Sequence, residues 1–318
     1  MIAAADLAPP ERDKGLAALG RVTLEDIRDP DGRAFRGAYA LLDAYFGALG
    51  ELEDRATLAA FVRRRRLVYG DGIEGTYHLV AAWCGGQIVG VRDCYVDVDR
   101  PAGVCVVALS HCFVAPAWRR SGLAAVLRAV PRALARRAAE ERGGPPLPTL
   151  LVTEMEPVDP ARPETVIRLL AYGRSGFAAL DPSRVRYSQV EFRDLPDAAH
   201  TGTPMLGVVR PLDLPPGPLP VAVVASFPRL FYACHRGFVP GARVDPGESL
   251  VRGALHASDA PVPLLPLPTA LDELPRLAPL VRGAVLPLYP PGLRGEQPRH
   301  GDADEELARV LAAWSRRG

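Results

Sequence analysis

The sequence lacks the features of disulfide-rich, metal-binding and membrane-spanning proteins. Its five cysteines form no C-x-x-C pair, and an odd number of thiols cannot all pair within one chain. We therefore expect no disulfide framework, no cysteine-based zinc site and no metal at the functional site. No window of about 18 residues is free of charge and proline, and residues 1–10 lack the basic and apolar segments of a signal peptide. The sequence predicts a cytoplasmic protein.

The sequence also lacks a large net charge of either sign. The 38 basic and 37 acidic side chains leave a formal charge of +1, so no global field attracts nucleic acid or an anionic membrane. The run Arg63 to Arg66 follows an amphipathic segment with Leu58, Phe61 and Val62. Basic residues are favoured at a helix C-terminus, so we interpret the run as a solvated helix end. We expect neither a nucleic-acid nor a membrane partner.

Proline, by contrast, is abundant. The 33 prolines among 318 residues are about double the usual share, and they are concentrated after Pro211, in the runs 211–220 and 261–268. The length exceeds a typical domain of about 100 to 200 residues. One large domain and one domain with an appended segment are both compatible with this length.

Hydrophobic periodicity predicts a mixed α/β fold over about the first 210 residues. After a loose start, we expect helices at 34–49, 54–65, 121–142 and 164–175, and strands at 21–27, 78–84, 87–98, 104–114, 149–155, 185–192 and 205–210. Gly85-Gly86 indicates a hairpin, and the strand-helix-strand unit 104–155 indicates two parallel strands.

The remaining residues carry no recognisable catalytic motif. We expect helices within 219–238, 247–257 and 302–316, and an edge strand or extended segment at 262–267 because proline cannot donate to a central ladder. This partly helical, proline-rich region is predicted to cover the acceptor side of a cleft, to form a homodimer interface or to pack on the sheet. We interpret His235 and His256 as structural.

The segment 113–124, Phe-Val-Ala-Pro-Ala-Trp-Arg-Arg-Ser-Gly-Leu-Ala, carries the clearest chemistry. An apolar strand passes through a tight turn into a helix that opens with Arg119-x-x-Gly122-x-Ala124. Consecutive backbone N–H groups at a helix N-terminus, with small residues and arginines nearby, suit a pyrophosphate. No GxGxxG follows a strand and no GxxxxGK occurs, so a dinucleotide fold or an NTPase is poorly supported.

The block from Val114 to Ala124 resembles the acetyl-coenzyme-A motif of the GNAT superfamily of N-acetyltransferases, (Arg or Gln)-x-x-Gly-x-(Gly or Ala). Two further family features occur in the expected order: the hairpin precedes this block, and a segment from Tyr172 to Phe177, similar to the family's Tyr-x-x-x-Gly-Phe signature, follows it. The resemblance covers residues 21–210. It implies an acetyl-CoA-dependent acetyltransferase domain at 1–212, an extension at 213–318, and strands 104–114 and 149–155 that splay apart to admit the pantetheine arm.

The resemblance also implies roles for individual residues. Tyr172 would protonate the leaving thiolate, although a packing role for this aromatic ring remains open. A side chain at position 122 would obstruct the pyrophosphate, whereas backbone groups of Cys112 and Val114 would follow the pantetheine. The full set of expected cofactor contacts is Cys112, Phe113, Val114, Arg119, Arg120, Ser121, Gly122, Leu123 and Ala124.

The general base is harder to assign. Family members often carry Glu or His on the strand before the loop, but the aligned inward positions hold Ala108 and Ser110, which cannot act as bases. We therefore expect the base to be Glu154 or Glu156, of which only one can face the cleft because strand side chains alternate. A rim carboxylate that binds a cationic substrate is the alternative. By the same alternation, His111 is interpreted as structural.

These features predict an acetyltransferase that transfers an acetyl group from acetyl-CoA to an amine, on a small molecule or a peptide, by direct attack on the thioester. Two alternatives remain open. One is a non-catalytic acyl-CoA-binding module that has lost its base, and the other is an acyltransferase that uses a longer acyl group.

Overall fold

A computed structural model of the chain describes residues 2–47, 52–64, 66–68, 74–141, 147–155, 163–190, 203–237 and 239–273. The chain divides into two compact units, the first comprising Met1–Val152 with Pro211–Leu214 and the second Thr153–Arg210 with Pro215–Gly318. The boundaries between the two units fall after Val152, Arg210 and Leu214, whereas the predicted domain boundary lies after residue 212. The assignment of residues 1–212 to a single acetyltransferase domain stays a prediction.

The sheet of the first unit follows the predicted order closely. It contains β1 (Thr23–Asp26), β3 (Glu74–Cys84), β4 (Gln87–Asp99), β5 (Val104–Val114) and the beginning of β6 (Thr149–Met155), with β2 (Arg66–Val68) beside β3. Gly85 and Gly86 join β3 to β4 at φ values of +55° and +76°, which glycine adopts without strain. The predicted hairpin and the predicted parallel pairing of β5 with β6 are both confirmed.

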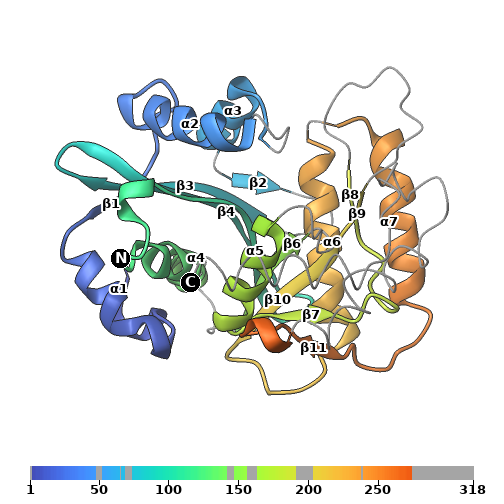
Figure 1. The fold of residues 1–318 in the computed structure, drawn as a ribbon. Coiled ribbons are helices and arrows are strands. Elements are labelled where there is room, and N and C mark those ends of the chain that lie inside the picture. Colours follow the sequence, from blue (N-terminus) through green and yellow to red (C-terminus); the bar gives the residue numbers. More distant parts are fainter. Residues whose placement is uncertain are drawn as a thin grey trace. The chain divides into compact units, whose positions relative to one another are not determined.

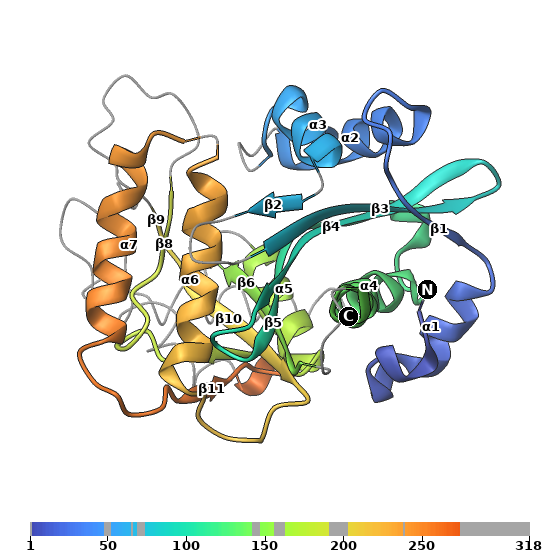
Figure 2. The ribbon, with the colours of Figure 1, turned by 180° about the vertical axis from the view of Figure 1, so that it is seen from behind.

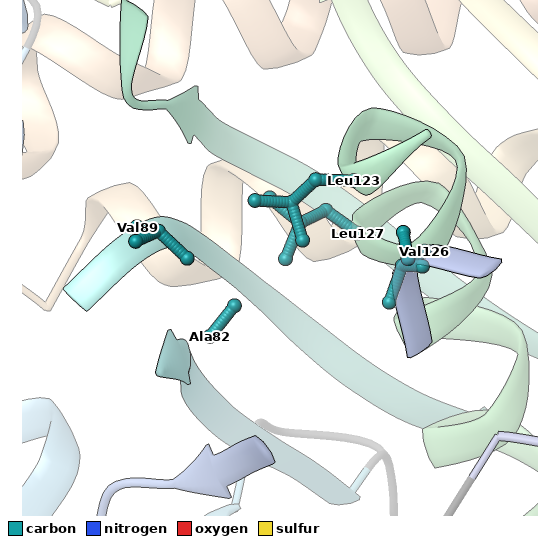
Figure 3. Packing of buried hydrophobic residues seen from close by; sticks show 6 residues of the cluster. Ala82, Val89, Leu123, Val126 and Leu127 are labelled. Carbon is teal, nitrogen blue, oxygen red and sulfur yellow. The ribbon is translucent and has the colours of Figure 1, made fainter. Parts of the chain in front are cut away.

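Helices cover both faces of this sheet. Figures 1 and 2 show α2 (Arg33–Phe46) and α3 (Arg55–Arg64) on one face, and α4 (Leu123–Glu141) with α1 (Arg12–Leu19) on the other. In Figure 3, side chains of α4 point towards strands β3 and β4 across the core; the cluster comprises Ala18, Ala82, Val89, Leu123, Val126 and Leu127. The α4 face of the sheet is thus a dry apolar layer. It fixes the beginning of α4 relative to the end of β5.

The N-terminal segment is ordered, contrary to the expectation of a loose start. Leu7 packs against Ala125 and Ala129 of α4. The buried carboxylate of Asp6 accepts hydrogen bonds at 2.5 and 3.1 Å from the guanidinium of Arg136. These partners are far away in the sequence, so local periodicity could not reveal them.

The described elements that follow β6 are α5 (Pro163–Arg174), β7 (Ala178–Leu180), β8 (Ser188–Gln189), β9 (Thr203–Pro204), β10 (Leu206–Leu212), α6 (Val221–His235), α7 (Gly241–Leu255) and β11 (Leu264–Pro266). Strands β10, β7 and β11 are antiparallel neighbours in the nine-stranded sheet, and β8 pairs with β9 in a separate two-stranded sheet. Strand β7 pairs with β10 on one side and with β11 on the other. The expected edge strand within 262–267 is confirmed as β11. Residues after 213 therefore contribute a strand to the same sheet as β7.

The sequence reading of the second unit was less accurate. Strand β7 was not predicted, and α7 begins before the predicted residue 247 and continues through Pro246. Of the expected strand 185–192, only Ser188 and Gln189 form a strand among the described residues. Residues 191 and 192 lie outside the described part of the chain. The expected helix 302–316 also lies outside. None of the helices that the structure describes is long and apolar enough to cross a membrane.

Candidate functional site

The turn between β5 and α4 has the backbone of an anion site. The chain leaves β5 at Val114, makes one short helical turn over Pro116–Trp118, and enters α4 at Leu123. Arg120 and Gly122 adopt φ values of +64° and +92°, in the left-handed region. This backbone conformation leaves the N–H groups of Arg120, Gly122 and Ala124 without an acceptor among the described residues. Such N–H groups at a helix N-terminus fit the oxygens of a pyrophosphate.

Ser121 holds this turn together. Its hydroxyl donates a hydrogen bond to the carbonyl of Trp118 at 2.6 Å and accepts one from the N–H of Leu123 at 3.3 Å. The side chain of Ser121 and the N–H of Leu123 are thus engaged within the turn. The backbone N–H groups of Arg120, Gly122 and Ala124 are therefore the better candidates for contacts with a pyrophosphate.

Contacts within the protein are a further reason for glycine at position 122. A Cβ atom at this position would lie 2.2 Å from the backbone carbonyl oxygen of Lys14, in α1. The space beside Gly122 is therefore filled by the protein itself, and its φ of +92° independently favours glycine. The expectation that a side chain here would obstruct the pyrophosphate stays a prediction. A side chain at position 122 would clash with Lys14 and displace helix α1.

Basic side chains surround the turn. Arg119 and Arg120 are exposed, and so is Lys14, the single lysine of the chain. The guanidinium of Arg21 lies 4.5 Å from the centre of the Trp118 ring, in a cation–π contact that holds positive charge at the turn. A phosphate group bound here would therefore meet positive charge as well as N–H donors.

The end of β5 positions Cys112, Phe113 and Val114. They pair with Arg92, Val91 and Gly90 of β4, and their side chains are half-buried. The described parallel ladder with β6 runs only from Cys105–Thr149 to Ala108–Val152, whereas β5 continues to Val114. This arrangement agrees with a cofactor arm that lies along the end of β5, which stays a prediction.

A buried polar cluster on β5 was missed by the sequence reading. The pairing of β4 with β5 shifts register between Arg92 and Cys94, opposite Ser110 and His111. A bulge of this kind interrupts the alternation of side chains on which the earlier interpretation of His111 relied. Ser110 is exposed and His111 is buried, with 8% of its surface accessible. Ser110 is thus not the inward-facing residue.

Asp93 organises this cluster. Its Oδ2 atom lies 3.2 Å from Nδ1 of His111 and accepts a hydrogen bond from the Tyr77 hydroxyl at 2.9 Å, and its Oδ1 atom accepts the His111 backbone N–H at 2.5 Å. Burial alone would raise the pKa of Asp93, but the charge of His111 and these hydrogen bonds lower it below the ordinary value. An ionised Asp93 would orient the imidazole and stabilise its protonated form. An aspartate within a strand, next to the free cysteine Cys94, gives no local signal of this role.

Tyr172 and Glu154 belong to the second unit. Tyr172 is half-buried near the end of α5, and its ring meets Phe177 edge to face at 4.9 Å. Gly176 follows this helix with a φ of +79°, the left-handed conformation that is common just after a helix C-terminus. Glu154 accepts a hydrogen bond from the Tyr187 hydroxyl at 2.6 Å through Oε2, and one from the amide of Gln189 through Oε1. Glu156 lies outside the described residues.

The comparisons with known proteins give distant matches only. No protein-family model matches the sequence, and no curated protein is significantly similar to it. Among solved structures, the chain is similar to an aminoglycoside acetyltransferase from an uncultured soil metagenomic sample, solved with sisomicin, at 15% identity over 49% of this chain and 87% of that one, with a TM-score of 0.34.

Two further solved structures show a similar degree of likeness. An acetyltransferase of the GNAT family from Staphylococcus aureus is 12% identical over 60% of this chain and 99% of its own, with a TM-score of 0.35. An acyl-CoA N-acyltransferase from Pseudomonas aeruginosa is 20% identical over 59% and 99%, with a TM-score of 0.31. Because these values are low, we base the functional proposal on the chain's own residues.

Proposed function

We propose that the chain is a GNAT-like N-acetyltransferase that transfers an acetyl group from acetyl-CoA to an amine. The observation that carries this proposal is the turn between β5 and α4, where Arg120, Gly122 and Ala124 present N–H groups with no acceptor among the described residues. Exposed Arg119 and Arg120 add the positive charge that a pyrophosphate requires. The acetyl-CoA thioester would supply the activated acyl group.

The buried cluster on the same strand supports a catalytic rather than a purely binding role. A protonated amine cannot attack a thioester, so a base must accept a proton from it. His111 is oriented through Nδ1 by Asp93, and Nε2 is the atom proposed to exchange the proton with an acceptor. Glu154 remains a candidate base, but both of its carboxylate oxygens accept hydrogen bonds from Tyr187 and Gln189. We therefore favour His111, with Asp93 as its positioning residue.

Tyr172 is proposed to donate the proton that the leaving thiolate takes up. Tyr172 lies near the end of α5, and its side chain is half-buried. A partly accessible phenol of this kind is compatible with proton donation. The sulfur atom would then leave as a neutral thiol. A small-molecule or peptide acceptor, a homodimer and a cytoplasmic location all remain part of the proposal.

The cofactor assignment is tested by measuring acetyl-CoA affinity by calorimetry in an Arg119→Glu variant. Reversal of the charge beside the N–H groups should weaken binding by about tenfold or more. Arg64→Glu is the matched control, since Arg64 is also an exposed arginine of the first unit but lies at the end of α3. Equal affinities of both variants and the wild type would overturn the assignment of the turn.

A further inference from the structure

Glu53 is a half-buried residue with a buried carboxylate oxygen, and the proposed mechanism does not use it. It lies just before α3, its backbone carbonyl accepts a hydrogen bond from the Tyr39 hydroxyl at 3.4 Å, and the neighbouring Asp54 caps α3 through the N–H groups of Ala56 and Thr57. The Oε2 atom of Glu53 is buried and has no hydrogen-bond partner among the described residues. A buried carboxylate oxygen without a partner is costly, so this one requires an explanation.

The charges that act on Glu53 come from three elements of the first unit. Burial raises the pKa of Glu53, and His111 on β5 opposes this rise, whereas Asp93 on β4 and the adjacent Asp54 add to it. Asp93 already accepts hydrogen bonds from His111 and Tyr77. This corner of the unit therefore holds the buried carboxylate of Asp93, the half-buried carboxylate of Glu53 and one imidazole. With both carboxylates ionised, it is short of positive charge and would be stabilised by a bound cation.

Aromatic rings continue from this acidic corner to the end of β5. The ring of Phe46 meets the His111 imidazole edge to face at 4.8 Å, and the ring of Tyr45 lies 4.9 Å from that of Phe46. Tyr45 in turn lies 6.0 Å from Phe113 and is 43% exposed, which is unusual for a large apolar side chain in this structure. The row Tyr45, Phe46 and Phe113 thus leads from an exposed ring to the strand that carries His111.

We propose that Glu53 is the counter-ion for a primary ammonium group of the acceptor, and that Tyr45, Phe46 and Phe113 contact the apolar or aromatic body that bears this ammonium. The inference rests on the proposed function, because it places the acceptor beside His111. It narrows the substrate class to arylalkyl or alkyl amines and disfavours neutral acceptors and acceptors that carry a carboxylate next to the amine.

The proton balance follows from these positions. The ammonium gives one proton to Nε2 of His111, and the neutral nitrogen then forms a bond with the acyl carbon as the carbon–sulfur bond breaks. The departing thiolate gains a proton from the Tyr172 hydroxyl, and the second proton that the nitrogen loses returns through solvent to the tyrosinate. His111 afterwards releases its proton to solvent, so the sum is an ammonium and a thioester converted to an amide, a thiol and a proton.

The test measures binding of benzylammonium and of benzyl alcohol to the full chain by ligand-observed NMR. The wild type should bind benzylammonium about 10- to 100-fold more tightly than the alcohol, and Glu53→Gln should remove that preference without changing affinity for the alcohol. Glu53→Asp should retain part of the preference. The control Glu25→Gln, which alters an exposed carboxylate on β1, should behave as the wild type.

A pH series separates a charge role from a structural one. Ammonium binding requires ionised Glu53, whose pKa is raised by burial, so the affinity should increase as pH rises through that pKa. The Glu53→Gln variant should show no such increase. A wild type without a preference for the ammonium, or a Glu53→Gln variant that keeps it, overturns this inference.

Acetyl-CoA affinity, measured on the same samples, keeps the two proposals apart. If acetyl-CoA binds and the ammonium preference is absent, the ammonium subsite is wrong and the cofactor assignment stands. If the ammonium preference is present and acetyl-CoA does not bind, the proposed function fails. In that case, the subsite would still bind cations, but its role as an acceptor site would be overturned.

Discussion

Gly122 and Lys14 are in close backbone contact: a Cβ atom at Gly122 would lie 2.2 Å from the Lys14 carbonyl oxygen. This contact joins α1 to the beginning of α4. It places the single lysine of the chain next to the turn whose N–H groups are proposed to bind a pyrophosphate. The N-terminal helix is therefore part of the structure that shapes this turn.

Gly122→Ala should destabilise the first unit by about 2 to 5 kcal/mol, because it adds both a positive-φ penalty and a steric clash. Gly103→Ala is the matched control, since Gly103 has a φ of +67° but nothing within 4 Å of the added methyl group. That variant should lose only about 1 kcal/mol. Urea unfolding measures both values, and equal losses would show that the Lys14 contact is unimportant.

Tyr77→Phe should shift the pH dependence of acetyl transfer. The Tyr77 hydroxyl donates to Asp93 and is one of the groups that lower the pKa of this carboxyl, so its removal raises that pKa. Ionised Asp93 is needed to stabilise the protonated His111 that forms during the reaction. We therefore expect the activity of the variant to fall at a higher pH than that of the wild type when the solution is acidified. The measurement is kcat/KM against pH. An unchanged acid limb would remove Asp93 from the mechanism.

His235 should make the second unit sensitive to acid. Burial lowers the pKa of His235 to about 3, far below the ordinary value of about 6.5. The unfolded chain therefore binds a proton that the folded chain does not, and stability is lost as pH falls from about 6.5 towards 3, by up to about 1.4 kcal/mol per pH unit. Urea midpoints of His235→Gln should show a weaker dependence over this range. A parallel dependence would contradict the assignment.

Gly173→Ala should destabilise the second unit by about 1 to 3 kcal/mol. A Cβ atom at Gly173 would lie 2.1 Å from the carbonyl oxygen of Pro268, and the adjacent Arg174 donates to the Thr269 carbonyl at 2.6 Å. The segment after β11 thus packs directly on the helix that carries Tyr172. Gly253→Ala, in α7 with no neighbour within 4 Å, is the control and should be neutral or stabilising. Equal thermal midpoints for both variants would show that this packing is dispensable.

Local signals were sufficient for the hairpin, for β5 and β6, and for the turn that follows β5. Gly85-Gly86 fixed the hairpin, and the apolar runs bounded by turns gave β5 and β6 at the observed residues. The turn from Phe113 to Ala124 was found because a strand end, small residues and arginines adjoin in the sequence. Features of this kind depend on neighbours within a few positions, which a sequence displays directly.

The rest depended on contacts between distant segments. The bulge in β5 reversed the expected orientation of Ser110 and His111, and a bulge has no clear sequence signature. Asp93 and Glu53 approach His111 only after the sheet and the α2–α3 face assemble. Helix α1 was missed because its order comes from packing on α4 rather than from a strong amphipathic pattern of its own.

The most direct test of the central claim is free-thiol release from acetyl-CoA, measured with and without a panel of primary amines, for the wild type and His111→Gln. We predict amine-dependent release by the wild type, a loss of about 100-fold or more in His111→Gln, and equal acetyl-CoA affinity of both proteins. Acetyl-CoA binding without amine-dependent thiol release by the wild type would contradict the account and favour a non-catalytic acyl-CoA-binding module.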